Sequence, residues 1–544
     1  MHHWISSLIS IWCCALPAHS SSLCKCEGTL RYASYYGDHM VLQKAPERAV
    51  VWGFGPEGVQ VNVTLLGPRP QNAPPVNVTE GKWKVTLDPV EAGGPYTVIA
   101  SMDQLSVNLT DVLFGEVWLC SGQSNMCFET EKVFNAEAEL QLTSQYPRVR
   151  VFMAGMRQSD QELDDLAAVQ QIWSVPTIES VKGFSALCWM FGRLLYADLS
   201  TPVGLVQSCW GGTVVETWSS TRALQQCGLD HDIVPRHKSE NRNSRLWNAM
   251  IHPFLKMTLK GAIWYQGESN TVVNKDVYNC SFPAMIDDWR SSFHEASGGQ
   301  TALNFPFGFV QLAPGVCLAL GLNYNNFAST IRWHQTADTG TAPNPRMKET
   351  FMAVAMDLPD NGSPYHPIHP RDKLTVANRL TLGARAVAYG EKDVPFLGPY
   401  PQKITFINNS LIITYDQAIT VRNGGGFEIC CPGVEANCSL ESPWNPAPMV
   451  NWSSYSVQVS SAECPSSHEN ILAPWIPEPW MKRGGNAAKA NSLATSCIHA
   501  NYGSGTAPCT TRSLSPLRRR ENSVNNNPSH LHDHSVAVSF WKWH

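Results

Sequence analysis

Apolar residues follow two different patterns along the chain, and the change between them divides it into regions. Up to about residue 111, short apolar runs are separated by Pro and Gly turn signals, a pattern typical of short β-strands. The strands predicted in this way cover residues 50–52, 59–65, 83–87 and 96–100. Runs of this kind predict an N-terminal β-sandwich domain over residues 30–111.

A second pattern covers residues 112–395, where continuous apolar runs alternate with segments of helical spacing. Helices are predicted over residues 184–199 and 370–389, because apolar residues recur there every three or four positions. The predicted strands cover residues 117–120, 203–207, 262–265, 307–312 and 352–356. Continuous apolar strands separated by helices predict an α/β domain with a mostly parallel sheet that is covered on both faces.

Strand-like runs return near the C-terminus, at residues 404–407 and 411–415. They predict a C-terminal β domain over residues 401–465. Residues 470–544 show no hydrophobic period and are rich in Ser, His and Asn. We expect this last segment to be irregular and disordered.

The composition indicates a globular chain of several domains. Hydrophobic residues make up 43% of the 544 residues and charged residues 16%, a balance far from that of disordered proteins. The formal net charge is −5, and no long basic run is present. These features argue against nucleic acid as the main partner.

Several features predict export from the cell. Residues 1–20 read as a secretory signal peptide, with a short apolar run at 4–16 and small residues before a cleavage site near Ser20. No later apolar run is long enough to cross a membrane. Sequons for N-glycosylation begin at Asn62, Asn77, Asn108, Asn279, Asn361, Asn408, Asn437 and Asn451. We therefore expect a glycoprotein without a membrane span that is secreted or lysosomal.

The 17 Cys lack the spacing of zinc sites, and disulfides suit an oxidising compartment. Cys24 with Cys26, and the adjacent Cys430 and Cys431, are therefore expected to take part in disulfides.

Three predicted strands end in polar loops that contain Gly or Pro, and this is where α/β enzymes place their sites. The loops read SGQSNM at 121–126, QGESN at 266–270, and a longer segment at 357–370 that ends in HPIHP. Ser124 lies between a predicted strand and a predicted helix start, where free N–H groups can stabilise an oxyanion. Taken alone, Ser124 would be read as a helix N-cap.

Three segments resemble the sialate O-acetylesterases, which belong to the carbohydrate esterase branch of the SGNH hydrolases. They are 118–126 (WLCSGQSNM), 264–270 (WYQGESN) and 368–373 (IHPRDK), and CWGGT around Gly211 and NAMI at 248–251 agree with them. The resemblance implies a three-layer α/β/α hydrolase core over residues 112–395, flanked by β domains. It is lost after about Glu441, so the C-terminal β domain is expected to be incomplete.

The resemblance implies that Ser124 is the nucleophile and His369 the general base. Chemistry asks for the same pair, because a hydroxyl is a poor nucleophile until an imidazole removes its proton. Many SGNH enzymes carry Asp three residues before the catalytic His, where this chain has His366. Either a backbone carbonyl near His366 orients His369 in a Ser-His dyad, or Asp360 completes a triad, with Asp372 as a further option.

Donors to the oxyanion are expected to be the N–H groups of Ser124 and Gly212, together with a side-chain amide from the third segment. The superfamily that the resemblance points to places an Asn in this segment; in this chain we take Gln266 as the first candidate and Asn270 as the second. The structural alternative for Gly211 and Gly212 is a tight turn, which is compatible with this role.

Other residues of these loops are candidates for contact with substrate or for holding the loops together. Gln123, Glu268 and His366 are the candidates for substrate contact, and Glu268 is also a candidate loop tie. Arg245 and Arg332 are candidates to bind a sialate carboxylate. Cys120 and Cys127 flank Ser124 and are expected to be buried or bridged, and His252 is expected to be a structural neighbour.

The implied reaction is hydrolysis of O-acetyl esters of sialic acids and sialoglycans, notably the 9-O-acetyl ester, with no metal and no cofactor. Two alternatives stay open. One is an acetylesterase that acts on another glycan such as acetylated xylan. The other is a catalytically inactive glycan-binding protein.

Overall fold

The computed structural model describes residues 29–229, 231, 239–314, 324–407, 410–421, 427–430 and 444–460. The predicted signal segment, Cys24, Cys26, Cys431 and the predicted disordered tail lie outside these residues. The expectations for them therefore stay predictions.

One mixed sheet of 12 strands dominates the fold, and its main path runs in the order β11-β10-β12-β9-β13-β14-β15. Neighbouring strands from β10 to β15 along this path pair in parallel, whereas β11 is antiparallel to β10. The strands are β9 (Leu105–Gly122), β10 (Val149–Ala154), β11 (Val169–Ser174), β12 (Val203–Cys209), β13 (Gly261–Tyr265), β14 (Phe307–Gln311) and β15 (Thr350–Val354). The expected α/β class, with a mostly parallel central sheet, agrees with this order.

The long strand β9 joins the N-terminal β region to this sheet. Its first part pairs with β8 (Gly93–Met102), its middle with β2 (Val41–Gln43), and its last part with β12 and β13. β8 in turn pairs with β4 (Gln60–Leu66), which also pairs with β5 (Gln71–Asn72) and β6 (Val76–Asn77). A separate three-stranded sheet holds β1 (Arg31–Tyr32), β3 (Val50–Phe54) and β7 (Lys82–Thr86).

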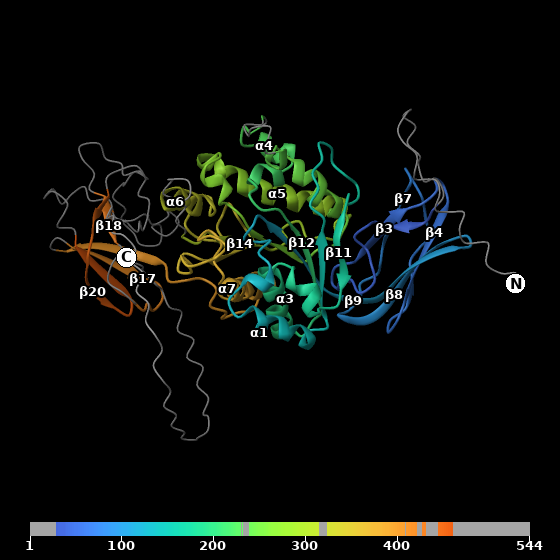
Figure 1. Cartoon of the computed structure of the whole chain (residues 1–544), viewed down its shortest axis with the longest axis horizontal. Coiled ribbons are helices and arrows are strands. Elements are labelled where there is room, and N and C mark those ends of the chain that lie inside the picture. Colours follow the sequence, from blue (N-terminus) through green and yellow to red (C-terminus); the bar gives the residue numbers. More distant parts are fainter. Residues whose placement is uncertain are drawn as a thin grey trace, which may run out of the picture.

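The helices pack in two groups. In Figure 1, α3 (Ala186–Leu199) and α7 (Lys373–Val387) lie below the strands β12 and β14, whereas α4 (Thr221–Gln225) and α5 (Tyr278–Ala296) lie above them. The remaining α-helices are α1 (Ala136–Gln141), α2 (Ile178–Lys182) and α6 (Tyr324–His334). Between these layers β12 and β13 are buried along their whole length, which explains their unbroken apolar sequences.

The C-terminal β region has a hydrophobic cluster of its own, which includes Leu411, Tyr415 and Val457. Its four-stranded sheet has the order β16-β17-β21-β20, and a further pair joins β18 to β19. The strands are β16 (Pro401–Ile407), β17 (Ser410–Tyr415), β18 (Glu428–Cys430), β19 (Trp444–Pro446), β20 (Met449–Ser453) and β21 (Ser456–Ser460).

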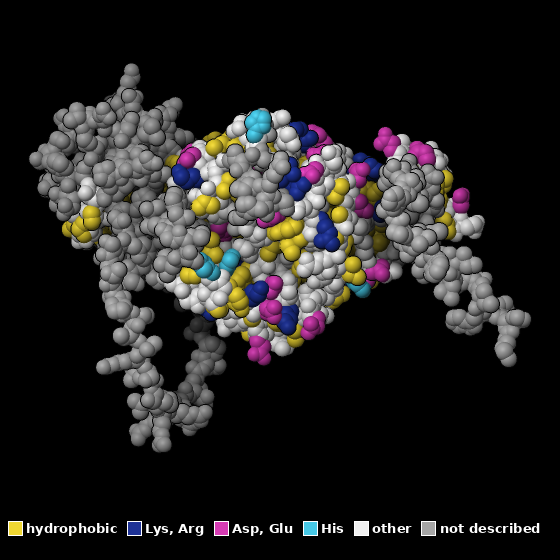
Figure 2. All heavy atoms as spheres, turned by 45° about the horizontal axis from the view of Figure 1, so that its top comes forward, with side chains coloured by type: hydrophobic (Ala, Val, Ile, Leu, Met, Phe, Trp, Pro, Cys, Tyr) yellow, Lys and Arg dark blue, Asp and Glu magenta, His cyan; other side chains and the backbone are white. Residues whose placement is uncertain are grey.

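Charges of both signs are mixed on the surface. On the face that Figure 2 displays, Lys and Arg lie among Asp and Glu, without an extended area of one sign in the described part. Among the described residues, no helix has the length and apolar character needed to span a membrane.

Glu139 of α1 is buried against α3, where its carboxylate binds Arg193 and accepts a hydrogen bond from the indole of Trp189. Glu139→Ala leaves the Arg193 charge buried without this partner, so we expect the free energy of unfolding to fall by about 3–5 kcal/mol. Urea unfolding followed by Trp fluorescence measures the change. Glu137→Ala, at an exposed position of the same helix, is the control and should change stability by less than about 0.5 kcal/mol. Equal effects of the two substitutions would contradict this role.

Candidate active site

The carboxyl ends of three neighbouring strands bring the predicted loops together. In the parallel register, Gly122 of β9 lies opposite Cys209 of β12 and Tyr265 of β13. The main chain locks these ends, because Trp210 N–H donates to the Gly122 carbonyl and Gln123 N–H donates to the Tyr265 carbonyl, both at 3.0 Å. The SGQSN, CWGG and QGESN segments therefore begin at the same edge of the sheet.

Gly122 is required at this junction. Its φ is +137°, and a Cβ atom there would lie 2.2 Å from the carbonyl oxygen of Tyr265. Any other residue would push β9 and β13 apart just before Ser124.

No helix begins at Ser124, and the expectation of a helix start there is wrong. The chain makes one turn, in which Met126 and Cys127 N–H both donate to the Gln123 carbonyl, and then becomes extended. The Phe128 carbonyl then accepts from Ala186 N–H, Thr130 N–H donates to the Phe184 carbonyl, and a short 3-10 helix covers Thr130–Lys132.

A disulfide between Cys127 and Cys209 links the Ser124 turn to the end of β12, and Cys120 is bonded to Cys188 of α3. The expectation that Cys120 and Cys127 are bridged is confirmed. Gly211 lies directly against Ser124, since a Cβ atom at Gly211 would lie 3.2 Å from the Ser124 Cβ atom.

His369 meets Ser124 from the loop after β15. The Ser124 hydroxyl lies 2.8 Å from Nε2 of His369, although the two residues are 245 positions apart. The other ring nitrogen, Nδ1, lies 2.7 Å from the Tyr365 carbonyl oxygen. A carbonyl only accepts hydrogen bonds, so Nδ1 carries the proton and Nε2 is free to accept one from Ser124.

Neither predicted carboxylate contacts the His369 ring. Asp360 forms a two-pronged ion pair with Arg371 and also accepts the main-chain N–H of that residue. Asp372 caps α7 by accepting from Thr375 N–H at 3.0 Å. The position of a third triad member is held by a backbone carbonyl, which was the dyad alternative.

The structure also corrects the side-chain amides proposed for the oxyanion. Gln266 Nε2 donates to the Thr213 carbonyl and to Asn270 Oδ1, and Asn270 Nδ2 donates to Glu216 and to the Val273 carbonyl. Both side chains are fully buried. Their N–H groups are used within the fold, where they tie the third loop to the segment after β12.

Two main-chain donors remain at the site. Among the described residues, the N–H groups of Ser124 and Gly212 make no hydrogen bond. Gly212 has a φ of +76°, and its carbonyl accepts from Asn241 at 3.0 Å, which holds the peptide that follows this N–H group.

Two buried polar side chains, Asn125 and Lys373, lie next to Ser124 and His369, and the sequence motifs did not single them out. Asn125 Nδ2 donates to Glu268 and to the Ile368 carbonyl, and Asn125 Oδ1 accepts from Lys373 Nζ at 2.6 Å. Lys373 is 1% exposed and also donates to the Pro370 carbonyl at 2.7 Å. Asn125 and Lys373 stand inside the quoted motifs, but a sequence does not reveal that such polar side chains are buried.

The surroundings of His369 favour its neutral form. Burial lowers the pKa of the ring, the hydrogen bond to the Tyr365 carbonyl raises it, and the charges of Lys373, His366 and Lys132 lower it further. Phe128 stacks on the ring at a centroid distance of 6.2 Å. The pKa of His369 therefore lies below its usual range, which favours the neutral ring.

The candidates for substrate contact differ in exposure. Gln123 and Glu268 are buried, and Gln123 Oε1 accepts from Ser269 N–H at 3.3 Å. Glu268 binds Asn125 and thus takes the position of a loop tie. His366 is half-buried, with a φ of +77°.

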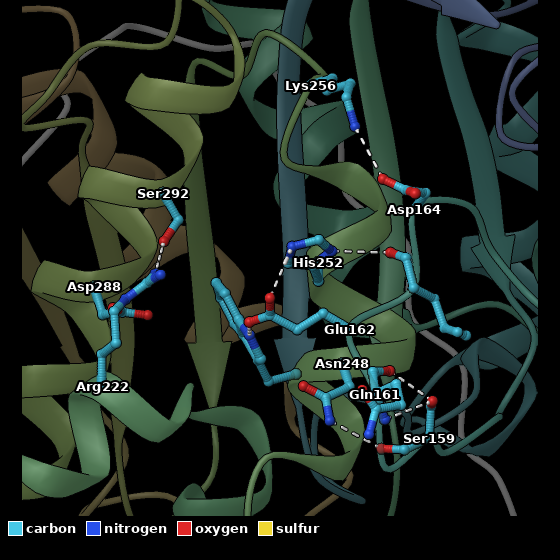
Figure 3. A network of polar contacts seen from close by, with 12 residues as sticks. Ser159, Gln161, Glu162, Asp164, Arg222, Asn248, His252, Lys256, Asp288 and Ser292 are labelled. Atoms are coloured by element: carbon cyan, nitrogen blue, oxygen red, sulfur yellow. Dashed lines mark hydrogen bonds and ion pairs between the residues drawn. The ribbon is translucent and has the colours of Figure 1, made fainter. Parts of the chain in front are cut away.

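The two candidate arginines already have protein partners. Arg245 binds Asp160 through two nitrogens, and Arg332 is buried and donates to the Leu312 carbonyl. His252 is bound to the Leu163 carbonyl and to Glu162, and Figure 3 shows its contact with Glu162. This agrees with the structural role expected for it. The described residues contain no cluster of His, Cys, Asp and Glu suited to a metal ion.

Two family models match parts of the chain. The family described as carbohydrate esterase, sialic acid-specific acetylesterase matches residues 114–377. The sialate O-acetylesterase C-terminal domain matches residues 402–473, so the likeness continues past Glu441, where the motif resemblance was lost.

Curated relatives and a solved structure extend the match to most of the chain. The sialate O-acetylesterase of Homo sapiens is 48% identical over 463 residues, 81% of this chain and 86% of that protein. The enzyme of Pongo abelii is 47% identical over 469 residues, covering 82% and 88%. The crystal structure of a carbohydrate acetylesterase from Xanthomonas citri is 28% identical, with a TM-score of 0.66 and coverage of 80% and 91%. The chain belongs to the sialate O-acetylesterase family.

Proposed function

We propose that the protein hydrolyses O-acetyl esters of sialic acids, notably the 9-O-acetyl ester, through a Ser-His acyl-enzyme mechanism. The observation that carries this proposal is the 2.8 Å hydrogen bond between Ser124 Oγ and His369 Nε2, beside two unused main-chain N–H groups. The substrate class follows from the family of its curated relatives.

In the first half-reaction, Ser124 Oγ attacks the acetyl carbonyl carbon while its proton moves to Nε2 of His369. The bond between the acetyl carbon and the sugar oxygen then breaks, and the same proton passes from His369 to that oxygen as the sugar leaves. An acetyl-Ser124 ester remains.

In the second half-reaction, water attacks this ester and gives its proton to the neutral His369 ring. The proton returns to Ser124 Oγ as acetate leaves. The Tyr365 carbonyl holds Nδ1–H throughout, so that Nε2 faces the reacting atoms in both steps.

The N–H groups of Ser124 and Gly212 are the proposed donors to the oxyanion, and each is worth about 3 kcal/mol in the transition state. The disulfide between Cys127 and Cys209 joins the two segments that carry them. The amides of Gln266 and Asn270 take a supporting role, because they fix the segment that follows Gly212.

We further propose that residues 112–395 form an SGNH-type three-layer core with β domains over 30–111 and 401–465. The helices on both sides of the sheet in Figure 1 and the separate C-terminal hydrophobic cluster support this division. The continuity of β9 ties the N-terminal domain to the core.

We propose that the protein is secreted or lysosomal. Three disulfides, which join Cys120 to Cys188, Cys127 to Cys209 and Cys227 to Cys280, support an oxidising compartment. Five sequon asparagines are exposed, as glycosylation requires: Asn62, Asn77, Asn108, Asn361 and Asn451.

The purified protein should release acetate from 9-O-acetylated sialic acid faster than from acetylated xylan. Ser124→Ala removes the attacking oxygen, so turnover should fall by about a thousandfold or more. Acetate release from both substrates measures the two effects. Equal or faster release from xylan would favour another glycan, and binding of the sialoglycan without hydrolysis would favour a lectin.

A fluorophosphonate probe followed by peptide mapping gives the control for this comparison. We expect labelling at Ser124 and not at Ser121, which is buried in β9. Labelling of another serine in place of Ser124 would remove the core of the mechanism.

The substitution Asp360→Asn distinguishes a Ser-His dyad from a triad that includes Asp360. Because Asp360 pairs with Arg371 and does not touch His369, turnover should stay within about tenfold of the wild type. A true triad Asp→Asn change costs about ten-thousandfold. A loss of that size, measured on the same substrate, would restore the triad.

The acid limb of kcat/KM should lie below pH 6.5, the ordinary pKa of imidazole. The reason is that burial and nearby positive charge lower the pKa of His369, so the neutral base persists as pH falls. Initial rates at subsaturating substrate between about pH 4 and pH 8 measure this limb. A limb above the ordinary value would contradict the burial seen here.

A further inference from the structure

Lys373 is the first residue of α7, and neither the helix nor its burial favours a charged side chain at this position. A cation in the first turn opposes the helix dipole, and burial of its charge is unfavourable. The ammonium group lies over the rings of Phe128 at 4.8 Å and Tyr265 at 5.2 Å. Residues that break local structural rules in this way are expected mainly at functional sites.

The hydrogen bonds of Lys373 join the two halves of the candidate site. Its Nζ donates to Oδ1 of Asn125, the residue after Ser124, and to the carbonyl of Pro370, the residue after His369. Asn125 Nδ2 in turn donates to the carbonyl of Ile368, the residue before His369. The loops of the nucleophile and of the base are thus bonded on both sides of the histidine.

The third loop supplies the counter-charge. Glu268 is buried and accepts from Asn125, and its second oxygen has no partner among the described residues. The Asn125 amide therefore lies between a buried carboxylate and a buried ammonium group. Asp372 and Asp360 are the other carboxylates that act on Lys373.

We propose that Lys373 is a positioning residue of the esterase, which holds the Ser124 and His369 loops together through Asn125 and keeps a positive charge close to the histidine. The inference rests on the proposed function, because it concerns the base of that reaction. Phe128 contacts both groups, since its ring stacks on His369 and lies under the Lys373 ammonium.

The positive charge of Lys373 acts on the pKa of His369, which packing contacts alone would not do. The groups of positive charge that act on His369 are Lys373, His366 and Lys132, and each disfavours protonation of the ring. Burial lowers the pKa of Lys373 itself to about 7, so its charge is present below neutral pH, where the acid limb lies. Removing it raises the pKa of His369 and moves the acid limb to higher pH.

The test compares Lys373→Met with the wild type, which must first hydrolyse 9-O-acetylated sialic acid. Methionine keeps most of the length of the side chain but carries no charge and no donor. We expect kcat to fall by about tenfold or more with little change in KM, and the acid limb of kcat/KM to move to higher pH. Lys373→Arg, which retains the charge, should keep the acid limb of the wild type even where kcat falls.

Arg385→Met is the matched control, because it removes another cation of α7. Arg385 pairs with Asp198 and Glu391. This substitution should leave kcat and the acid limb unchanged. If Lys373→Met does not fold, Lys373→Gln replaces it as the neutral variant. An unchanged kcat, or a lower kcat with the acid limb of the wild type, would overturn the inference. Absence of activity in the wild type would instead overturn the proposed function.

Discussion

The parallel pairing of β9 with β12 on one side and β13 on the other is the constraint on which the site depends. Because parallel strands end at the same edge, this pairing brings together three loops that are distant in sequence. The strands are buried on both faces, so a register shift would disrupt their close packing and move Ser124 away from Gly211. The stability of the sheet and the geometry of the chemistry therefore have the same origin.

Much of this arrangement could be predicted from the order of apolar residues. Strands at 203–207 and 262–265 and the helix at 184–199 lie within about two residues of β12, β13 and α3, because both faces of these elements are covered and their patterns are strong. The helix α5 was not predicted, although it is the longest described one. Its polar residues and Pro283 hide the period, and its burial comes from contacts with other elements.

The sequence predicted the contact between Ser124 and His369 but not the hydrogen bonds that occupy the neighbouring amides. Ser124 and His369 could be paired because their chemistry requires a partner, whatever the distance between them in sequence. Gln266 and Asn270 have suitable amides, but only coordinates show that Thr213, Glu216 and each other already use their N–H groups. Hydrogen-bond satisfaction depends on all neighbours at once, so residue type alone cannot decide which donor remains for a substrate.

The replacement of a triad carboxylate by the Tyr365 carbonyl fits the other charges around His369. A carboxylate at Nδ1 would orient the ring and would also raise its pKa, since it stabilises the protonated form. A carbonyl orients the ring with less of this effect, and burial together with the charge of Lys373 lowers the pKa of His369. In the proposed mechanism the imidazolium of each half-reaction is then less stabilised, so more of the barrier would have to be lowered at the oxyanion. Under that proposal the Cys127–Cys209 disulfide and the close approach of Gly211 to Ser124 would matter, because they link the segments that carry the Ser124 and Gly212 N–H groups before substrate arrives.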